Sequence, residues 1–268
     1  MADDSTQTLP YIFYWNPFSI CSLQVRYTIA ISGTTKPLGD PMVVEERQVN
    51  IYAGEQLDEA FLCTVNPEGQ VPVMSHQTTL AQPIRDSLEI TLYMAEKYPD
   101  LIPASHKGKI LPLLEELHSI NYFSLSFTGM QEVINMHLRD PIVKLLESPG
   151  ISQRYHDALQ YKLSVVEKDK VRGLEEAQVK IEEEKARCVL SKLNSFVQQE
   201  QGPWMFGRDQ PTALDAHGII FLARLDDVGR ANFIPSGLKR YYTMAMDSPE
   251  WRSVMEGRRT MITMAQML

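Results

Sequence analysis

Apolar and polar residues alternate with two different periods in the first hundred residues. The run YIFYW at 11–15 is aromatic and β-branched, as a buried strand would be. Further strands are predicted over residues 42–51, 70–74 and 78–82, and helices over residues 20–31, 54–65 and 88–97. The order βαβ followed by ββα predicts a mixed sheet with helices packed on it.

From about residue 108 the strand signals vanish and helical periodicity takes over. Residues 113–138 predict a long helical region, and a second one covers residues 153–199. The middle of the second region, EKDKVRGLEEAQVKIEEEKAR, is densely charged and predicts a solvated helix face. Three shorter helices are expected near 212–228, near 236–246 and from the SPEW segment onward. We therefore expect an α/β domain over residues 8–100 and an all-helical domain over 108–268.

Composition and charge narrow the function classes. Hydrophobic residues make up 44% of the 268 residues, enough for a sizeable core, and the net charge of −8 argues against nucleic acid or an anionic membrane as partner. Cys21, Cys63 and Cys188 form no CxxC pair or His/Cys cluster, so no metal site is expected. The acidic start MADDSTQTLP does not resemble a signal peptide, and the thiols suit a reducing compartment, which predicts a cytoplasmic protein.

Four segments carry a resemblance to a known family. FSICSLQVR, NPEGQVPVM, RDSLEI and PTALDAHG resemble, in this order, motifs of the cytosolic glutathione transferase superfamily. The first resembles the S-S-C-S-x-x-V-R segment of the zeta class, with Ile20 in place of the second serine. The resemblance covers roughly residues 11–256. It implies a thioredoxin-like βαβ–ββα domain that binds glutathione, a C-terminal helical bundle that binds an apolar electrophile, and a homodimer.

Ser19 and Cys21 are the candidate catalytic residues. From the sequence alone, Ser19 is a favoured helix N-cap, and the resemblance makes it the hydroxyl that stabilises the glutathione thiolate. The two roles are compatible. Cys21 matches the motif cysteine and is either a supporting residue or a small apolar residue of the first helical turn. Tyr14, on the first strand, is an alternative thiol activator or a core residue.

Five positions are the candidate glutathione-binding residues. Asp86 and Ser87 open a helix and, from the pattern alone, are an N-cap pair. The resemblance implies that Ser87 binds the γ-glutamyl carboxylate and Asp86 the ammonium group of glutathione. It also implies that Val71 pairs through its backbone with the cysteinyl unit, that Pro72 follows a cis peptide bond, and that Gln56 binds the glycyl carboxylate.

The second substrate is expected to bind between the two parts of the chain. Tyr14, Phe123, Phe127, Met130 and His137 are the candidate pocket residues, with ordinary helical core as the alternative. The PTALDAHG segment predicts a helix-capping box without chemistry.

The resemblance implies glutathione conjugation or reversible addition that isomerises a double bond. Zeta-class enzymes isomerise maleylacetoacetate, and fungal secondary metabolism uses proteins of this form, some as isomerases. A non-catalytic binding or regulatory protein of the same fold is the alternative. A thioredoxin-type reductase is disfavoured because no CxxC follows the first strand.

Overall fold

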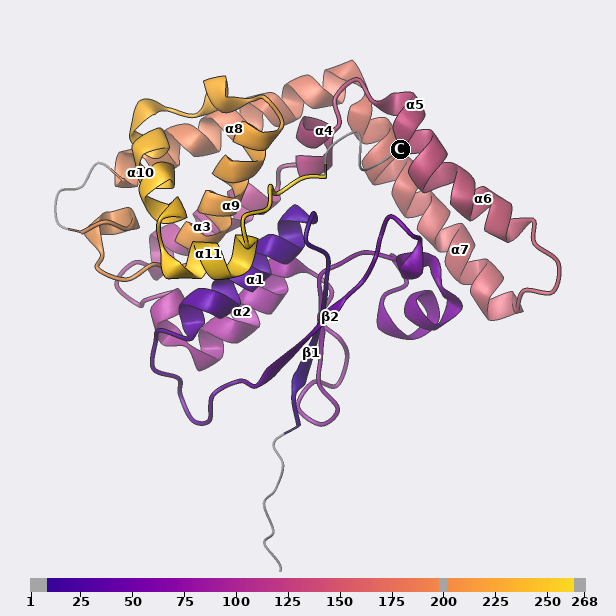
Figure 1. Ribbon diagram of the computed structural model, residues 1–268, viewed down its shortest axis with the longest axis horizontal. Helices are drawn as coiled ribbons and strands as arrows, with labels where there is room; N and C mark the ends of the chain where they lie inside the picture. Colours follow the sequence, from indigo (N-terminus) through magenta and orange to yellow (C-terminus); the bar gives the residue numbers. More distant parts are fainter. Residues whose placement is uncertain (1–8, 198–201, 263–268) are drawn as a thin grey trace, which may run out of the picture.

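A three-stranded mixed sheet forms the centre of the N-terminal part. The computed structural model describes residues 9–197 and 202–262. Strand β1 (Tyr11–Trp15) lies in the middle, parallel to β2 (Val44–Gln48) and antiparallel to β3 (Val73–Ser75). Figure 1 shows the sheet below the helices α1 and α2. The predicted mixed sheet is confirmed, with three strands.

The fourth predicted strand, over residues 78–82, is wrong. The ring of His76 accepts hydrogen bonds through Nδ1 from the backbone N–H groups of Thr78 at 3.2 Å and Thr79 at 3.0 Å. This contact bends the chain into a turn, and the chain returns to the sheet only at one bridge between Met74 and Ile84. A side chain that caps a turn thus overrides the β-branched pattern.

Two helices flank the sheet and two short turns join β2 to β3. Helix α1 (Ile20–Ser32) follows β1, and α2 (Ser87–Lys97) follows the bridge after β3. Between β2 and β3 lie a 3₁₀ turn, η1 (Glu55–Leu57), and a π turn, η2 (Phe61–Val65). These turns replace the regular helix predicted over residues 54–65.

The remaining elements described by the structure are helical. Besides four short 3₁₀ turns, they are α3 (Lys107–His118), α4 (Tyr122–Ser126), α5 (Gln131–Ile134), η4 (Asn135–Arg139), α6 (Asp140–Leu146), α7 (Gln153–Val166), η5 (Glu167–Val171), α8 (Glu176–Phe196), α9 (Ala213–Asp227), α10 (Ser236–Met246) and α11 (Pro249–Met255). None of the described helices is both long and apolar enough to cross a membrane.

The helical region predicted over residues 113–138 is interrupted twice. Asn121 accepts hydrogen bonds from the backbone N–H groups of Phe123 and Ser124, which starts α4 as a new helix. Helix α4 ends at Ser126, and Gly129, with a φ of +77°, lies in the turn between α4 and α5. The chain therefore forms the separate helices α3, α4 and α5 instead of one continuous helix.

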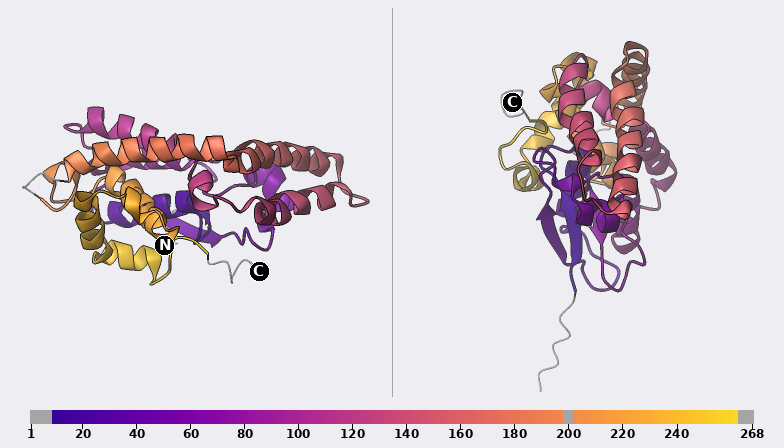
Figure 2. Two further views of the ribbon diagram at one scale, coloured as in Figure 1. Left: turned by 90° about the horizontal axis from the view of Figure 1, so that it is seen from above. Right: turned by 90° about the vertical axis from the view of Figure 1, so that its right-hand side faces the viewer.

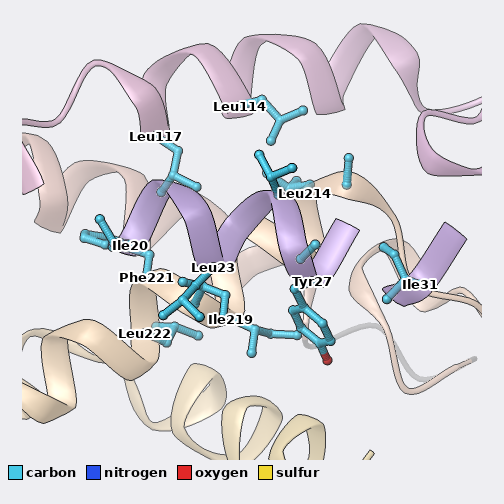
Figure 3. Packing of buried hydrophobic residues seen from close by; sticks show 14 of the residues in the cluster. Ile20, Leu23, Tyr27, Ile31, Leu114, Leu117, Leu214, Ile219, Phe221 and Leu222 are labelled. Carbon is cyan, nitrogen blue, oxygen red and sulfur yellow. The ribbon is translucent and has the colours of Figure 1, made fainter. Parts of the chain in front are cut away.

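One hydrophobic core joins the sheet side to the helical side. Ile20, Leu23 and Tyr27 of α1 are almost fully buried. They pack between α3, through residues such as Leu117, and α9, through residues such as Phe221 (Figure 3). Because α1 belongs to the N-terminal part and shares this core, the division at residues 100–108 stays a prediction.

The capping box at the start of α9 is present as predicted. The backbone N–H of Thr212 donates to Asp215 Oδ2 at 2.7 Å, and its hydroxyl donates to the same oxygen at 2.6 Å. The other carboxylate oxygen of Asp215 accepts from the Met205 N–H and the Tyr241 hydroxyl. This buried carboxylate anchors α9 and has no access to a substrate.

A second, smaller core fastens the hairpin of α6 and α7 to the loop between β2 and β3. The hairpin lies at one end of the molecule, on the right in Figure 1 and in the left-hand view of Figure 2. Its apolar residues pack on that loop, and the cluster comprises Leu57, Leu62, Ile142, Tyr155, Leu159 and Val166. The hydroxyl of Tyr155 also donates to the Leu57 carbonyl at 2.7 Å. We call α6 and α7 together the arm.

Candidate functional site

A cavity of about 360 Å³ lies where the carboxyl end of β1, the start of α2, the β2–β3 connection and the helical part meet. Its volume is within the range of small-molecule sites in proteins. Predicted site residues that line it are Ser19, Cys21, Gln56, Val71, Asp86, Ser87, Phe123, Phe127 and His137. These residues are far apart in the sequence, and the fold brings them to one place.

Three predicted site residues do not line the cavity. Tyr14 packs edge-on against Phe61 at 6.1 Å between ring centroids, in a small cluster around Val73, so it belongs to the core of the sheet. Met130 precedes α5, just after the turn at residue 129. Pro72 forms the cis peptide bond with Val71 that the resemblance implies. The structure thus favours Tyr14 as a core residue over its role as thiol activator.

Ser19 is the N-cap of α1 and also contacts the opposite wall. Its Oγ accepts a hydrogen bond from the Ser22 N–H at 3.3 Å and donates to the Val71 carbonyl at 3.4 Å. Both bonds are long, so the hydroxyl is weakly held and can turn toward an anion in the cavity. The N-terminal end of α1 adds partial positive charge at the same point.

Cys21 lies one residue into α1 and is half-buried. Burial raises the pKa of its thiol, whereas the charges of Lys170 and Arg224 and a hydrogen bond from Ser87 lower that pKa. Since burial dominates, the thiol of Cys21 stays protonated at neutral pH. The two cations still create a local field that favours a negative charge at a sulfur in this part of the cavity.

The first turn of α2 forms a second polar wall. Asp86 Oδ1 accepts from the backbone N–H groups of Leu88 at 2.8 Å and Glu89 at 3.0 Å, so Asp86 is the N-cap. Ser87 is the first residue of the helix and is 3% exposed, yet it lines the cavity. Its hydroxyl and the helix-start N–H groups suit a carboxylate.

Three cations that the sequence did not single out also line the cavity: Lys162, Lys170 and Arg224. Arg224 is buried, and its guanidinium donates to the carbonyls of Phe18 at 2.8 Å and Thr260 at 2.6 Å. Burial lowers the pKa of Arg224 to about 10, so it stays charged at neutral pH. The ammonium of Lys170 lies 4.8 Å from the ring centroid of Phe123, a cation–π contact inside the cavity.

The predicted solvated face of residues 167–187 is therefore wrong in two places. Lys170 lies in the π turn η5 and faces the cavity. Glu182 is 1% exposed, and its carboxylate accepts from the Asn121 N–H at 2.8 Å and from Gln178 Nε2 at 2.6 Å. The charged sequence pattern hides these buried groups because neighbouring positions are exposed.

A chain of hydrogen bonds starts at His118 on the cavity wall. Its Nε2 pairs with Nδ1 of His217 at 2.8 Å, and His217 Nε2 pairs with the Thr91 hydroxyl at 2.9 Å. Burial lowers the pKa of His118 to about 4, so the imidazole is neutral above that pH. Within residues 9–197 and 202–262, no three His, Cys, Asp or Glu side chains are grouped to hold a metal ion.

Curated plant proteins match part of the sequence, whereas no protein-family model matches it. Glutathione S-transferase Z1 of Arabidopsis thaliana is 29% identical over 138 residues, which is 51% of this chain and 53% of that protein. A zeta-class glutathione S-transferase of Euphorbia esula is 35% identical over 95 residues, which is 34% of this chain and 37% of that protein. The chain thus spans at most about half the length of these relatives.

Solved structures resemble the chain over nearly its whole length. The beta-etherase LigF from Sphingobium sp. strain SYK-6 has a TM-score of 0.65 with 14% identity, covering 92% of this chain and 99% of that one. A glutathione transferase homologue from sulfitobacter with bound glutathione has a TM-score of 0.59 with 15% identity, covering 93% and 98%. At such identities the likeness concerns the fold, and it confirms the predicted thioredoxin-like part joined to a helical part.

Proposed function

Because the chain belongs to the glutathione transferase superfamily, we propose that it activates the thiol of glutathione for attack on an electrophile. The observation that supports this most directly is the meeting of Ser19, Val71 and Ser87 at one cavity that also holds cations. Glutathione carries two carboxylates, so a cationic cavity in a protein of net charge −8 favours such a ligand.

In the proposed complex, the tripeptide lies along the N-terminal part of the cavity. Ser87 and the N–H groups that begin α2 bind the γ-glutamyl carboxylate, and Asp86 binds the ammonium group with its remaining carboxylate oxygen. The backbone of Val71 pairs with the cysteinyl unit like an added strand. Gln56 faces the glycyl end. Its Oε1 is buried and has no hydrogen-bond partner among the described residues, so this acceptor suits the backbone N–H of the glycyl unit, and only the Nε2 group can donate to the glycyl carboxylate.

The sulfur of bound glutathione is proposed to lie near Ser19. A free thiol titrates near ~8.5, so only a minority is ionised at neutral pH. The Ser19 hydroxyl can donate to the thiolate, and Lys170 and Arg224 add a positive field, which at the neighbouring Cys21 thiol offsets part of the rise in pKa caused by burial. Together they favour the nucleophilic form of glutathione.

The electrophile is proposed to bind against Phe123 and Phe127, whose rings lie 4.5 Å apart and line the apolar side of the cavity. In conjugation, a carbon–sulfur bond forms, and the adduct is completed by loss of a leaving group or by protonation of carbon. In isomerisation, the thiolate adds to a conjugated double bond and pushes the electron pair onto a carbonyl oxygen. The new single bond then rotates, the electron pair returns, and the thiolate leaves unchanged.

The similarity to zeta-class proteins favours reversible addition over conjugation. We propose that the protein is a homodimer, and fungal secondary metabolism is one setting in which such an isomerisation would be used.

Mass spectrometry with a small amount of glutathione distinguishes the reaction types. With maleylacetoacetate as substrate, an isomerase gives a product of unchanged mass over many turnovers per glutathione. With 1-chloro-2,4-dinitrobenzene, a transferase consumes one glutathione for each adduct. Binding of glutathione without turnover of either substrate would favour the non-catalytic alternative.

The glutathione site has its own test. Ser87→Ala should weaken glutathione binding about 10- to 100-fold in calorimetry, the effect of one hydrogen bond to a charged group. Ser191→Ala, an exposed serine on α8, is the matched control and should leave the affinity unchanged. An unchanged affinity in Ser87→Ala would remove Ser87 from the site.

A further inference from the structure

Lys162 is a buried cation that the proposed chemistry does not use. It lies on α7 and is only 6% exposed, yet it lines the cavity. Its Nζ donates one hydrogen bond, to the carbonyl of Gly69 at 3.0 Å. An ammonium group has three donors. No carboxylate in the described part of the chain forms an ion pair with this group, although burying an unpaired charge is costly.

Packing against neighbouring residues fixes the position of the Lys162 side chain. Gly69 has a φ of +55°, and a Cβ there would lie 3.1 Å from Lys162 Cδ, 3.0 Å from the Gln56 carbonyl and 2.9 Å from Leu62 Cδ2. The lysine stem thus passes directly over a glycine that cannot be enlarged. The same glycine touches the backbone of Gln56, so Lys162 approaches the cavity at the Gln56 end.

The arm holds the lysine in that place. The Tyr155 hydroxyl donates to the Leu57 carbonyl, Arg154 donates to the Cys63 carbonyl, and the Ser152 hydroxyl donates to Glu59 at 2.5 Å. These bonds and the second core attach α7 to the loop that carries Gln56. The lysine is therefore presented by a docked helix rather than by a mobile surface chain.

We propose that Lys162 binds the glycyl carboxylate of glutathione together with Gln56, so that the helical arm supplies one wall of the glutathione site. This inference rests on the proposed use of glutathione. A carboxylate accepts the two free ammonium donors and neutralises the buried charge. Glu55, the acidic neighbour of Gln56 in the sequence, is engaged elsewhere, because its Oε2 accepts from the Asn50 N–H at 2.6 Å.

The other charges around Lys162 are consistent with an anion at this point. Burial is the main cause that lowers the pKa of Lys162, and the like charge of Lys170 lowers it further. Glu68 and Asp169 act in the opposite direction but do not compensate. A carboxylate from glutathione or from the electrophile would supply the missing negative charge, and the two sources need to be separated.

Calorimetry with two ligands distinguishes a carboxylate supplied by glutathione from one supplied by the electrophile. Glutathione and its glycyl monoethyl ester, which lacks the glycyl charge, are titrated into the wild type, Lys162→Met and the control Lys168→Met, an exposed lysine in η5. The wild type and the control should bind the ester about 10- to 100-fold more weakly than glutathione. Lys162→Met should bind glutathione about as weakly as the ester and should no longer distinguish the two ligands.

Each other outcome has a defined meaning. Equal binding of both ligands by the wild type overturns the proposal without any variant, and leaves the electrophile as the carboxylate source. Persistent discrimination in Lys162→Met, with an unchanged melting temperature or a higher one, assigns the carboxylate to other residues and also overturns it. A wild type that binds neither ligand contradicts the use of glutathione itself, which is a failure of the proposed function.

Discussion

Replacing Lys162 by methionine is expected to stabilise the folded protein at neutral pH, although it deletes a hydrogen bond. Burial lowers the pKa of this lysine from the usual 10.5 to about 7. Each pH unit of such a difference corresponds to about 1.4 kcal/mol, so the charged side chain costs the fold up to about 5 kcal/mol. Methionine keeps an unbranched stem over Gly69 and brings no charge.

The lost hydrogen bond offsets part of this gain. In Lys162→Met the Gly69 carbonyl has no ammonium donor, and an unsatisfied buried polar group costs about 1–3 kcal/mol. The expected net increase in the free energy of unfolding is up to about 2–4 kcal/mol. At about 2–4 °C for each kcal/mol in a chain of this size, the melting temperature should rise by up to about 4–16 °C.

Thermal unfolding at pH 6.5 and pH 10 tests the reasoning, with Lys168→Met as the exposed control. The unfolded chain binds the lysine proton up to pH 10.5 and the folded protein only up to about pH 7, so the wild type gains stability as pH rises between these values. The advantage of Lys162→Met should therefore shrink at pH 10. A variant less stable than the wild type at pH 6.5, or an advantage that grows with pH, would refute the assigned cost of burial.

Three further outcomes are expected. The affinity for S-methylglutathione, which has no thiol to titrate, should fall as pH rises from 6 to 8.5 because Lys162 loses its proton near pH 7. In Lys162→Met the affinity measured by calorimetry should not change over this pH range. A wild-type affinity that does not change with pH would contradict binding of the carboxylate by charged Lys162. Ser19→Ala should raise the pKa of the bound glutathione thiol, measured by thiolate absorbance against pH, and should slow turnover with little loss of affinity. Tyr14→Phe is the control. An unchanged thiol pKa in Ser19→Ala would show that Ser19 does not stabilise the thiolate. The chain should form a homodimer of about twice 30.6 kDa in light scattering, and a monomer at micromolar concentration would refute this.

The fold could be predicted from the sequence where periodicity and chain punctuation agree. YIFYW became β1, and the helices α2, α9 and α10 end within a few residues of the predicted limits. The predictions failed where one side chain redirects the backbone. His76 turns residues 78–82 away from the sheet, and Asn121 starts a new helix inside a periodic stretch.

The candidate site also contains residues that could be predicted from the sequence and residues that could not. The motif residues Ser19, Val71 and Ser87 could be predicted because short patterns carry them, and the structure brings them to one cavity. The cations could not, because a single lysine in a charged helical stretch looks like a surface residue. A signal was nevertheless present: Tyr155, Leu159, Lys162 and Val166 follow the spacing of a buried stripe, and lysine is the exception in it.

The stability and the affinity attributed to Lys162 are two consequences of the same buried charge. In the empty cavity the charge opposes docking of the arm, and part of the population relieves this by losing the proton. A bound carboxylate stabilises the charged form of Lys162. Part of the free energy of attraction between the two groups is therefore used to protonate the neutral lysines. The net gain in affinity is therefore smaller than a bare ion pair would suggest, which is why a 10- to 100-fold effect is expected. By linkage, saturating glutathione should raise the free energy of unfolding of the wild type more than that of Lys162→Met, by the free energy that corresponds to the ratio of the two affinities. The stability difference between the two proteins should therefore become smaller.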